Sequence, residues 1–122
     1  MLKRVMCLAG VCAVLGAFAL PVRAQQQTDE FTVVNVEYEG SKLWLPATLI
    51  VHKGDKVKIK LINNVKGDPN QHGYKIAAFN VETVVTRGEP ATVEFVADKA
   101  GVFPITCQLH PAHIGGQLLV LQ

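Results

Sequence analysis

The sequence predicts an all-β fold, a Greek-key antiparallel β-sandwich, and two observations lead to this prediction. From residue 31 onward, short runs rich in β-branched and aromatic residues alternate with turns that contain Gly, Pro, Asn or Asp. Over the same part of the chain, no segment repeats its apolar residues with the spacing of an amphipathic helix. Roughly seven short strands at regular spacing, without helices between them, are typical of a sandwich.

The first 24 residues have the three parts of a secretory signal peptide. A basic start at residues 3–4 precedes an apolar run over residues 5–20, and the small residues Val22 and Ala24 fit a cleavage point. The apolar run is short for a membrane-spanning helix, so we expect cleavage and no membrane anchor in the mature form. The mature domain would then be residues 25–122, exported to the periplasm.

Removal of this segment changes the charge and the sulfur chemistry of the protein. Three of the 12 basic residues lie in it, so nine remain against ten acidic ones and the formal net charge falls from +2 to −1. A nearly neutral domain without a cluster of Lys or Arg gives no electrostatic reason to expect nucleic acid as a partner. Two of the three cysteines and both methionines are also lost. Cys107 is then the one thiol of a single small domain.

Three expected strands lie in the first half of the domain. Residues 31–38 are rich in β-branched and aromatic side chains. The apolar run 43–51 contains Pro46, which favours an edge or a bend because proline lacks the N–H that a central strand needs. Charged and apolar residues alternate over 56–62, so this strand is expected to have one exposed face and one buried face.

Five further strands are expected beyond a polar loop at residues 63–71. They are residues 73–79, 81–86, 91–96, 102–107 and 117–121. The connection at residues 97–101 is compatible with a single helical turn. The aromatic residues Trp44, Tyr74 and Phe103 are expected to pack in the core or against the sheets.

One thiol and two imidazoles lie close together near the C terminus. Cys107 is followed by His110 and His113 in the segment Cys-Gln-Leu-His-Pro-Ala-His, directly after an apolar strand. A thiolate with neutral imidazoles is a mixed sulfur and nitrogen ligand set that suits copper and is acceptable to zinc. Pro111 disfavours the α conformation at His110, so the loop should turn in a defined way. A lone cysteine is commonly a small buried hydrophobe, but the two histidines at this spacing favour a metal site.

The remaining polar residues separate into one candidate ligand and several unconnected groups. His72 ends the polar loop and begins a strand, which makes it either an upstream metal ligand or a capped loop histidine. His52 lies beside the turn at residues 53–55 without metal-type spacing, so we expect it to be solvated. Carboxylates occur singly and no serine lies in a nucleophile motif. The sequence therefore does not indicate acid–base or nucleophilic catalysis.

Three segments together resemble the cupredoxins. They are Val-His-Lys-Gly-Asp-Lys-Val at residues 51–57, His-Gly-Tyr at residues 72–74 and the stretch at residues 97–111 that contains Phe-Pro-Ile-Thr-Cys-Gln-Leu-His-Pro. Within this family the chain is most similar to the nitrosocyanin group of red copper proteins, over nearly the whole mature domain. The resemblance implies one copper ion per chain, held between an upstream strand end and the loop that joins the last two strands.

The resemblance also implies the ligands. Cys107 matches the thiolate ligand, and His110 matches the histidine that follows it in the same loop. His113 resembles the further histidine of the nitrosocyanin loop but comes two residues earlier, at the spacing where short-loop blue copper proteins have methionine. His72 stands where the nitrosocyanin group has a glutamate, as in ordinary cupredoxins. We therefore expect His72, Cys107, His110 and His113 to bind the metal.

Two classes of function remain open. The first is a periplasmic electron carrier rather than an enzyme, which exchanges electrons with redox partner proteins through the edge of His110. The second is a small copper enzyme or ligand-binding protein that acts on a small nitrogen oxide or oxygen species, which requires an open coordination position. Copper storage or delivery and a zinc site are weaker alternatives, and the resemblance allows a homo-oligomer. A binuclear copper centre would need a second bridging cysteine, and a multicopper oxidase would need more residues and more histidines.

Overall fold

The computed structural model describes residues 26–122, so the expected signal peptide at residues 1–24 lies outside the described part. The strands and the one short 3-10 helix follow in this order: β1 (Thr28–Tyr38), β2 (Ser41–Leu45), β3 (Thr48–His52), β4 (Lys56–Asn63), β5 (Gln71–Ile76), η1 (Ala77–Phe79), β6 (Val81–Thr86), β7 (Ala91–Val96), β8 (Gly101–Ile105) and β9 (Gly116–Leu121). No helix in the described residues has the length and apolar character needed to cross a bilayer.

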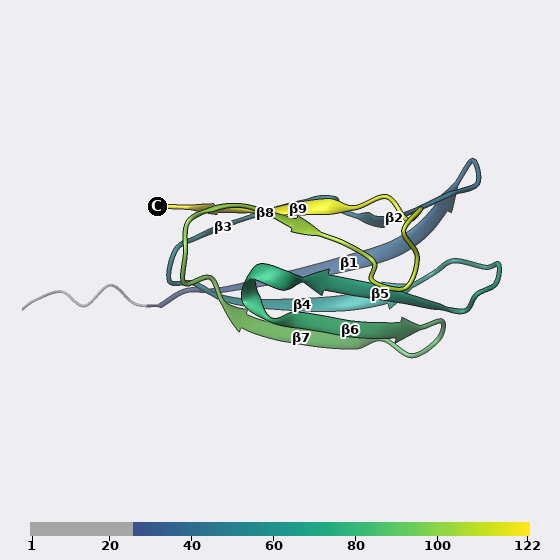
Figure 1. Ribbon diagram of the computed structural model, residues 1–122. Helices are drawn as coiled ribbons and strands as arrows, with labels where there is room; N and C mark the ends of the chain where they lie inside the picture. Colours follow the sequence, from purple (N-terminus) through teal and green to yellow (C-terminus); the bar gives the residue numbers. More distant parts are fainter. Residues whose placement is uncertain (1–25) are drawn as a thin grey trace, which may run out of the picture.

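The strands form a two-layered sandwich, as predicted. One sheet has the strand order β2-β1-β4-β7, and the other has the order β3-β9-β8. The β5–β6 hairpin contacts β7 through β6 and β8 through β5, so it joins the two sheets along one side. The turn between β1 and β2, the polar loop before β5 and the loop after β8 lie at one end of the sandwich, and the C terminus lies at the other (Figure 1).

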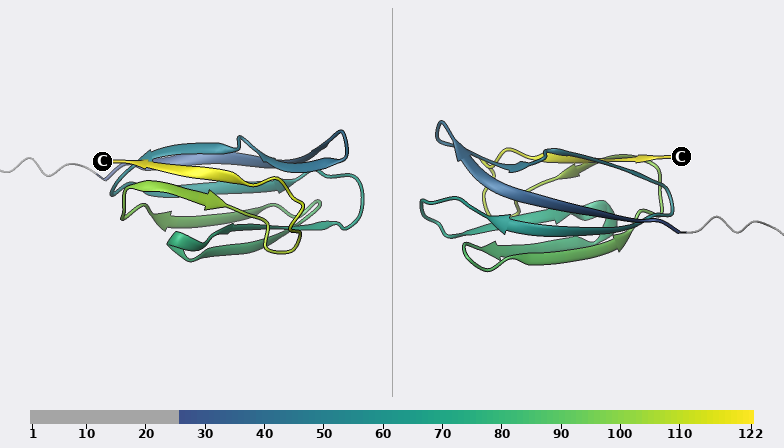
Figure 2. Two further views of the ribbon diagram at one scale, coloured as in Figure 1. Left: turned by 45° about the horizontal axis from the view of Figure 1, so that its top comes forward. Right: turned by 180° about the vertical axis from the view of Figure 1, so that it is seen from behind.

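Two strand pairs are parallel, which differs from the purely antiparallel sandwich that we expected. They are β1 with β4 and β3 with β9, and β1 and β4 run side by side in Figure 2. At residues 46–47 the chain bends and passes from one sheet into the other without reversing its direction. Because β2 and β3 therefore run the same way, the turn at residues 53–55 sends β4 back parallel to β1.

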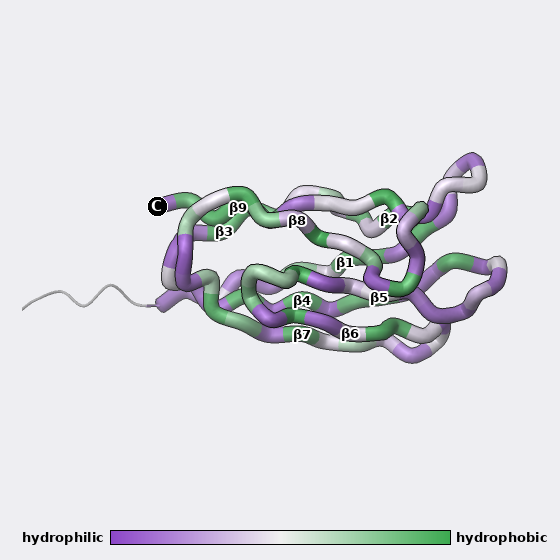
Figure 3. Tube along the Cα trace, in the orientation of Figure 1, coloured by the Kyte–Doolittle hydropathy of each residue, from purple (hydrophilic) through white to green (hydrophobic). Residues whose placement is uncertain are grey.

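The core fills the space between the sheets with alternate residues of the strands. In β4, the side chains of Val57, Ile59 and Leu61 are completely buried, while Lys60 is exposed. Figure 3 shows hydrophobic and hydrophilic residues alternating along the strands. Burial of one such aliphatic side chain contributes about 1.5–3 kcal/mol. These three residues of β4 therefore contribute several kcal/mol.

The aromatic residues lie where the sequence predicts them. Trp44 and Tyr74 are in the core cluster, and the ring of Phe103 packs against the cluster at its edge. The centroids of the Trp44 and Tyr74 rings are 5.3 Å apart in an edge-to-face arrangement, which aromatic pairs prefer over a face-to-face stack.

Two local expectations differ from the structure. The strand predicted over residues 73–79 ends at Ile76, and Ala77–Phe79 form a 3-10 turn because the chain must reverse before β6. Asn80 makes this reversal with a left-handed backbone at φ 54°, a conformation that Asn tolerates better than most residues. The connection at residues 97–101 contains no helical turn.

Gly116 permits a close approach between the start of β9 and the segment before β3. A Cβ atom there would overlap the Ala47 carbonyl oxygen and lie 3.0 Å from its carbonyl carbon. The same oxygen accepts a hydrogen bond from the Gln117 N–H at 2.8 Å. Because a backbone group cannot swing aside, we expect Gly116→Ala to lower the free energy of unfolding by about 1–3 kcal/mol. Thermal unfolding followed by circular dichroism would measure this loss as a fall in Tm of at least about 4 °C.

Gly67→Ala is the matched control for this substitution. A Cβ atom at Gly67 would meet only the Glu37 Oε2 atom, at an ordinary contact distance of 3.7 Å. Its Tm should therefore remain close to that of the parent protein. Equal Tm values for Gly116→Ala and Gly67→Ala would show that β9 is not held as closely as the structure indicates.

Candidate metal centre

Three potential metal ligands meet at one end of the sandwich. The ligating atoms of His72, Cys107 and His110 all lie within 4.8 Å of one another. His72 is the second residue of β5, and the other two residues follow β8. Two backbone hydrogen bonds between Lys75 and Thr106, of 2.8 and 2.9 Å, hold the segment after β8 against β5. This pairing places Cys107 beside His72, although the two residues are far apart in the sequence.

The Cys107 sulfur lies in a largely buried environment with a backbone donor directed at it. Its residue is 7% exposed, and the Gly73 N–H donates to Sγ over 3.1 Å. On the other side of the same residue, the Gly73 carbonyl accepts a hydrogen bond from Trp44 Nε1 at 3.0 Å. His110 Nδ1 is 3.6 Å from the sulfur. A backbone N–H stabilises negative charge on sulfur, which a thiolate ligand carries.

Gly73 also leaves room for the ligand loop. A Cβ atom at this position would overlap the side chain of Gln108, which donates through Nε2 to the Thr83 carbonyl at 3.0 Å. Glycine thus allows the residue after Cys107 to reach across β5 and bond to β6. The loop is therefore attached to the hairpin on both sides of the sulfur.

His72 is a buried imidazole whose ring nitrogens lack hydrogen-bond partners. Its exposed fraction is 0%, and among the described residues neither Nδ1 nor Nε2 has a hydrogen-bond partner. Burial lowers the pKa of His72 to about 4, with smaller contributions from the charges of His110, His113 and Lys42 and an opposing one from the Pro69 carbonyl. The ring is therefore neutral at pH 7, as a metal ligand must be. A buried polar group without a partner costs about 1–3 kcal/mol, and a bound metal ion would remove this cost.

His113 lies beside the three-residue cluster and is hydrogen-bonded to protein groups. Its ring centroid is 5.4 Å from that of His72. Its Nε2 is 2.9 Å from Asn35 Oδ1, and its Nδ1 is 3.1 Å from the Ile114 carbonyl. Burial is the main cause of a lowered pKa at His113, so this ring is also neutral at pH 7. Its role as a fourth ligand stays a prediction.

Asn35 holds the His113 ring from β1. Its side chain is fully buried, and its Nδ2 atom has no hydrogen-bond partner among the described residues. A neutral imidazole donates from one nitrogen only, so Nδ1 can donate to the Ile114 carbonyl while Nε2 accepts. Rotation of the Asn35 amide by a half turn lets Nδ2 donate to Nε2, an assignment that the hydrogen-bond network favours.

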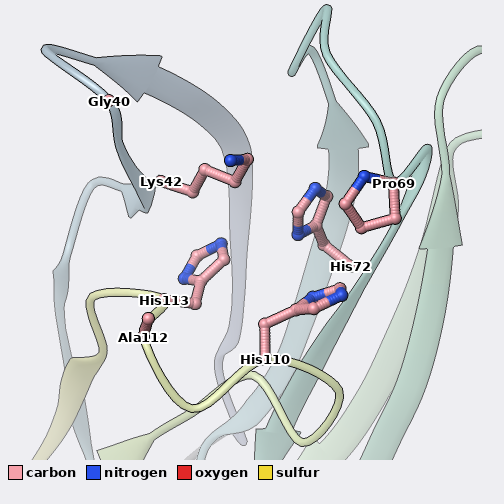
Figure 4. A pocket seen from close by; sticks show the side chains of 7 residues that line it. All are labelled: Gly40, Lys42, Pro69, His72, His110, Ala112 and His113. Carbon is pink, nitrogen blue, oxygen red and sulfur yellow. The ribbon is translucent and has the colours of Figure 1, made fainter.

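A cavity of about 210 Å³ opens beside the cluster. The residues that line it are Gly40, Lys42, Pro69, His72, His110, Ala112 and His113. Figure 4 shows the Lys42 ammonium group from β2, the imidazole of His72 from β5 and those of His110 and His113 from the loop after β8 directed toward this common space. Cys107 is not part of the lining, so the cavity meets the candidate centre on its imidazole side.

The fourth histidine of the chain has no part in this centre. The side chain of His52 is 65% exposed, and its Nδ1 lies 3.9 Å from Asp55 Oδ2, which agrees with the expected solvated turn residue. Sequence reasoning missed Asn35 and Lys42. Asn35 could have been found because it is a polar residue at an inward-facing position of β1, two residues after the buried Val33. The sequence contains no comparable signal for Lys42.

The two-sheet sandwich with a His/Cys/His cluster at one end defines a copper-binding β-sandwich domain. Comparison with known families gives it a family: residues 10–120 match the cupredoxin-like domain, and the chain belongs to this family. The three clustered residues are consistent with the copper site of such a domain.

Two curated relatives match part of the chain. The nitrous-oxide reductase of Cupriavidus necator is 42% identical over 64 residues, and that of Ralstonia nicotianae is 38% identical over 64 residues. Each match covers 51% of this chain but 10% of the relative. The chain thus spans about a tenth of the length of these relatives.

Two solved structures share the fold. Copper nitrite reductase from Nitrosomonas europaea aligns with a TM-score of 0.61 and 24% identity over 78% of this chain and 42% of that one. A chain of a heme-copper terminal oxidase dimer aligns with a TM-score of 0.63 and 15% identity over 81% of this chain and 67% of that one. At these identities the likeness concerns the fold alone.

Proposed function

We propose that this protein is an exported mononuclear copper protein that carries electrons in the periplasm. The observation that supports this best is the group of ligand atoms from His72, Cys107 and His110 within 4.8 Å of one another. Copper in this sulfur and nitrogen ligand set would supply one-electron redox chemistry. The periplasmic location rests on the signal-like segment at residues 1–24.

The surroundings of the ligands suit a carrier because they are held rigidly. The loop at residues 64–70, which leads to His72, is fixed by Arg87, whose Nη1 donates to the carbonyls of Val65 at 3.0 Å and Gly67 at 3.1 Å. The backbone pairing of β5 with the segment after β8 fixes Cys107. Ligands that move little when the metal changes its oxidation state keep the reorganisation energy low, and this favours fast electron transfer.

The surface around His110 suits contact with a redox partner protein. His110 is partly exposed, and two apolar side chains of the same loop, Leu109 and Ile114, are 43% and 48% exposed. Exposed apolar side chains beside a redox centre can bind a partner briefly and bring the two centres close together. Electrons would then pass through the exposed edge of His110.

A second candidate is a ligand-binding copper protein or small copper enzyme of the nitrosocyanin type. The observation that favours it is the cavity on the imidazole side of the cluster, since an added small molecule needs space beside the metal. Both candidates require the same copper site. They differ in whether a molecule from solution reaches it.

Copper loading of the purified mature protein tests the shared proposal. We expect one copper ion per chain, a strong sulfur-to-copper absorption band and a mononuclear Cu(II) resonance spectrum. Trp44 is the one tryptophan of the chain, and its ring is stacked 6.1 Å from that of His113. Its fluorescence should therefore be strongly quenched as copper binds. A protein that takes up no copper, or one that prefers zinc when both ions are offered, would overturn the proposal.

A further inference from the structure

The cavity beside the candidate centre is lined by one positively charged side chain, that of Lys42. Among the described residues that line it, none is acidic. The other polar side chains in the lining are the imidazoles of His72, His110 and His113, toward which the Lys42 ammonium group is directed (Figure 4). Such a lining favours negatively charged ligands over cations.

The position of Lys42 is fixed by hydrogen bonding of its backbone. Its carbonyl accepts a hydrogen bond from the Ile114 N–H at 2.8 Å, in the same loop that carries His113. A bridge between Leu43 and Ile114 continues this contact. The base of the lysine side chain is therefore fixed against the ligand loop, and only its outer part can move.

Among the described residues, the one carboxylate within 4.0 Å of the Lys42 ammonium group binds it weakly. Lys42 Nζ is 3.9 Å from Glu37 Oε2, at the limit of an ion pair, and the two side chains are 26% and 39% exposed. Ion pairs with such exposure contribute little because water screens them. The ammonium group also faces the cavity, since Lys42 is one of the residues that line it (Figure 4).

We propose that this cavity binds a small inorganic anion next to the metal, with Lys42 as its counter-charge. This inference rests on the copper site proposed above. Cu(II) with one thiolate and neutral imidazoles has a net charge of +1, and Lys42 adds a second positive charge within the same cavity. A volume of about 210 Å³ equals the share of roughly seven water molecules. It has room for an anion the size of azide or nitrite and is too small for a nucleotide.

Azide titration of the copper-loaded protein tests the inference. We expect azide to change the optical and paramagnetic resonance spectra in a saturable way. Lys42→Gln should weaken apparent azide binding by about tenfold, as loss of one nearby charge in a partly screened site predicts. Lys42→Arg should stay within about threefold of the parent protein because it keeps the charge. The difference in azide affinity between Lys42→Gln and the parent protein should become smaller as salt is added.

Two controls separate the charge from a general disturbance of the site. Lys56→Gln removes a lysine that is more exposed than Lys42, 48% against 26%, and that pairs with Glu94 at 3.3 Å. Lys56 begins β4, at the end of the sandwich away from the cavity, so azide binding should be unchanged. Imidazole, which binds metals in its neutral form, should bind equally well to the parent and to Lys42→Gln. Copper stoichiometry and Trp44 quenching should be equal in all variants.

The outcomes distinguish the inference from the function on which it rests. Equal azide affinity in the parent and Lys42→Gln would overturn the role of Lys42. The same conclusion would follow if Lys56→Gln lost as much azide affinity as Lys42→Gln. A copper-loaded parent that shows no response to azide or nitrite would overturn the anion site and leave the electron carrier intact. A parent protein that binds no copper would overturn the proposed function itself.

Discussion

Replacement of Cys107 by serine is expected to abolish the sulfur-to-copper absorption band of the copper-loaded protein. Cys107 is the one sulfur ligand within the described residues, and a serine hydroxyl stays protonated where a thiol gives up its proton to a metal. Loss of a residue that only hydrogen-bonds to a metal ligand lowers metal affinity by about 10–100-fold. We therefore expect copper affinity to fall by more than about 100-fold when the thiolate itself is lost.

The fold should survive this substitution, which makes the result interpretable. The Gly73 N–H that donates to the sulfur at 3.1 Å can donate to a serine oxygen instead. The metal-free forms of the parent and Cys107→Ser should therefore have similar Tm values by circular dichroism. His52→Ser is a suitable control, because it changes an exposed histidine outside the cluster and should keep the full absorption. A coloured Cys107→Ser protein would show that the thiolate is not the ligand.

The local part of this centre could be predicted from the sequence because its residues lie close together along the chain. Cys107 and His110 are three positions apart, so their meeting requires only one turn of a short loop. The position of His72 at the end of a polar loop, together with the family resemblance, makes it a candidate ligand. The structure adds the backbone pairing of Lys75 with Thr106 that brings this distant residue to the sulfur.

The surroundings of the centre could not be predicted because they depend on how separate strands are aligned. Asn35 reaches His113 across 78 positions of sequence, and no local pattern encodes this distance. Lys42 lies in the cavity because β2 pairs with β1 in one register, and a shift by one residue would turn its side chain to the other face.

The positions of the strands could be predicted because they depend on local sequence patterns. Alternation in a segment such as residues 56–62 records which side chains face the core, and the structure confirms this for β4. The same alternation does not indicate whether β4 runs parallel or antiparallel to β1. This direction depends on whether the chain reverses at Pro46 or only bends, and both behaviours are compatible with a proline between two apolar runs.

The second large effect is expected from His113→Met, which should raise the reduction potential and strengthen absorption near the blue-copper position. An imidazole is a stronger donor than a thioether and stabilises Cu(II) more than Cu(I). If His113 binds the metal, its replacement should favour the reduced state by at least tenfold, or about 59 mV for one electron. Redox titration and optical spectra of the copper-loaded proteins measure both changes. His52→Met, the same substitution at an exposed histidine outside the cluster, should leave both unchanged.

Asn35 allows the same prediction to be tested in the opposite direction. In the structure, the His113 Nε2 atom is 2.9 Å from Asn35 Oδ1, so binding to copper through this nitrogen requires that the hydrogen bond be given up. Asn35→Ala removes the competing partner and leaves a buried nitrogen unsatisfied, which costs about 1–3 kcal/mol unless the metal takes it. We expect Asn35→Ala to lower the potential while His113→Met raises it. Parent-like potentials in His113→Ala, His113→Met and Asn35→Ala together would exclude His113 as a ligand and leave the fourth position open toward the cavity.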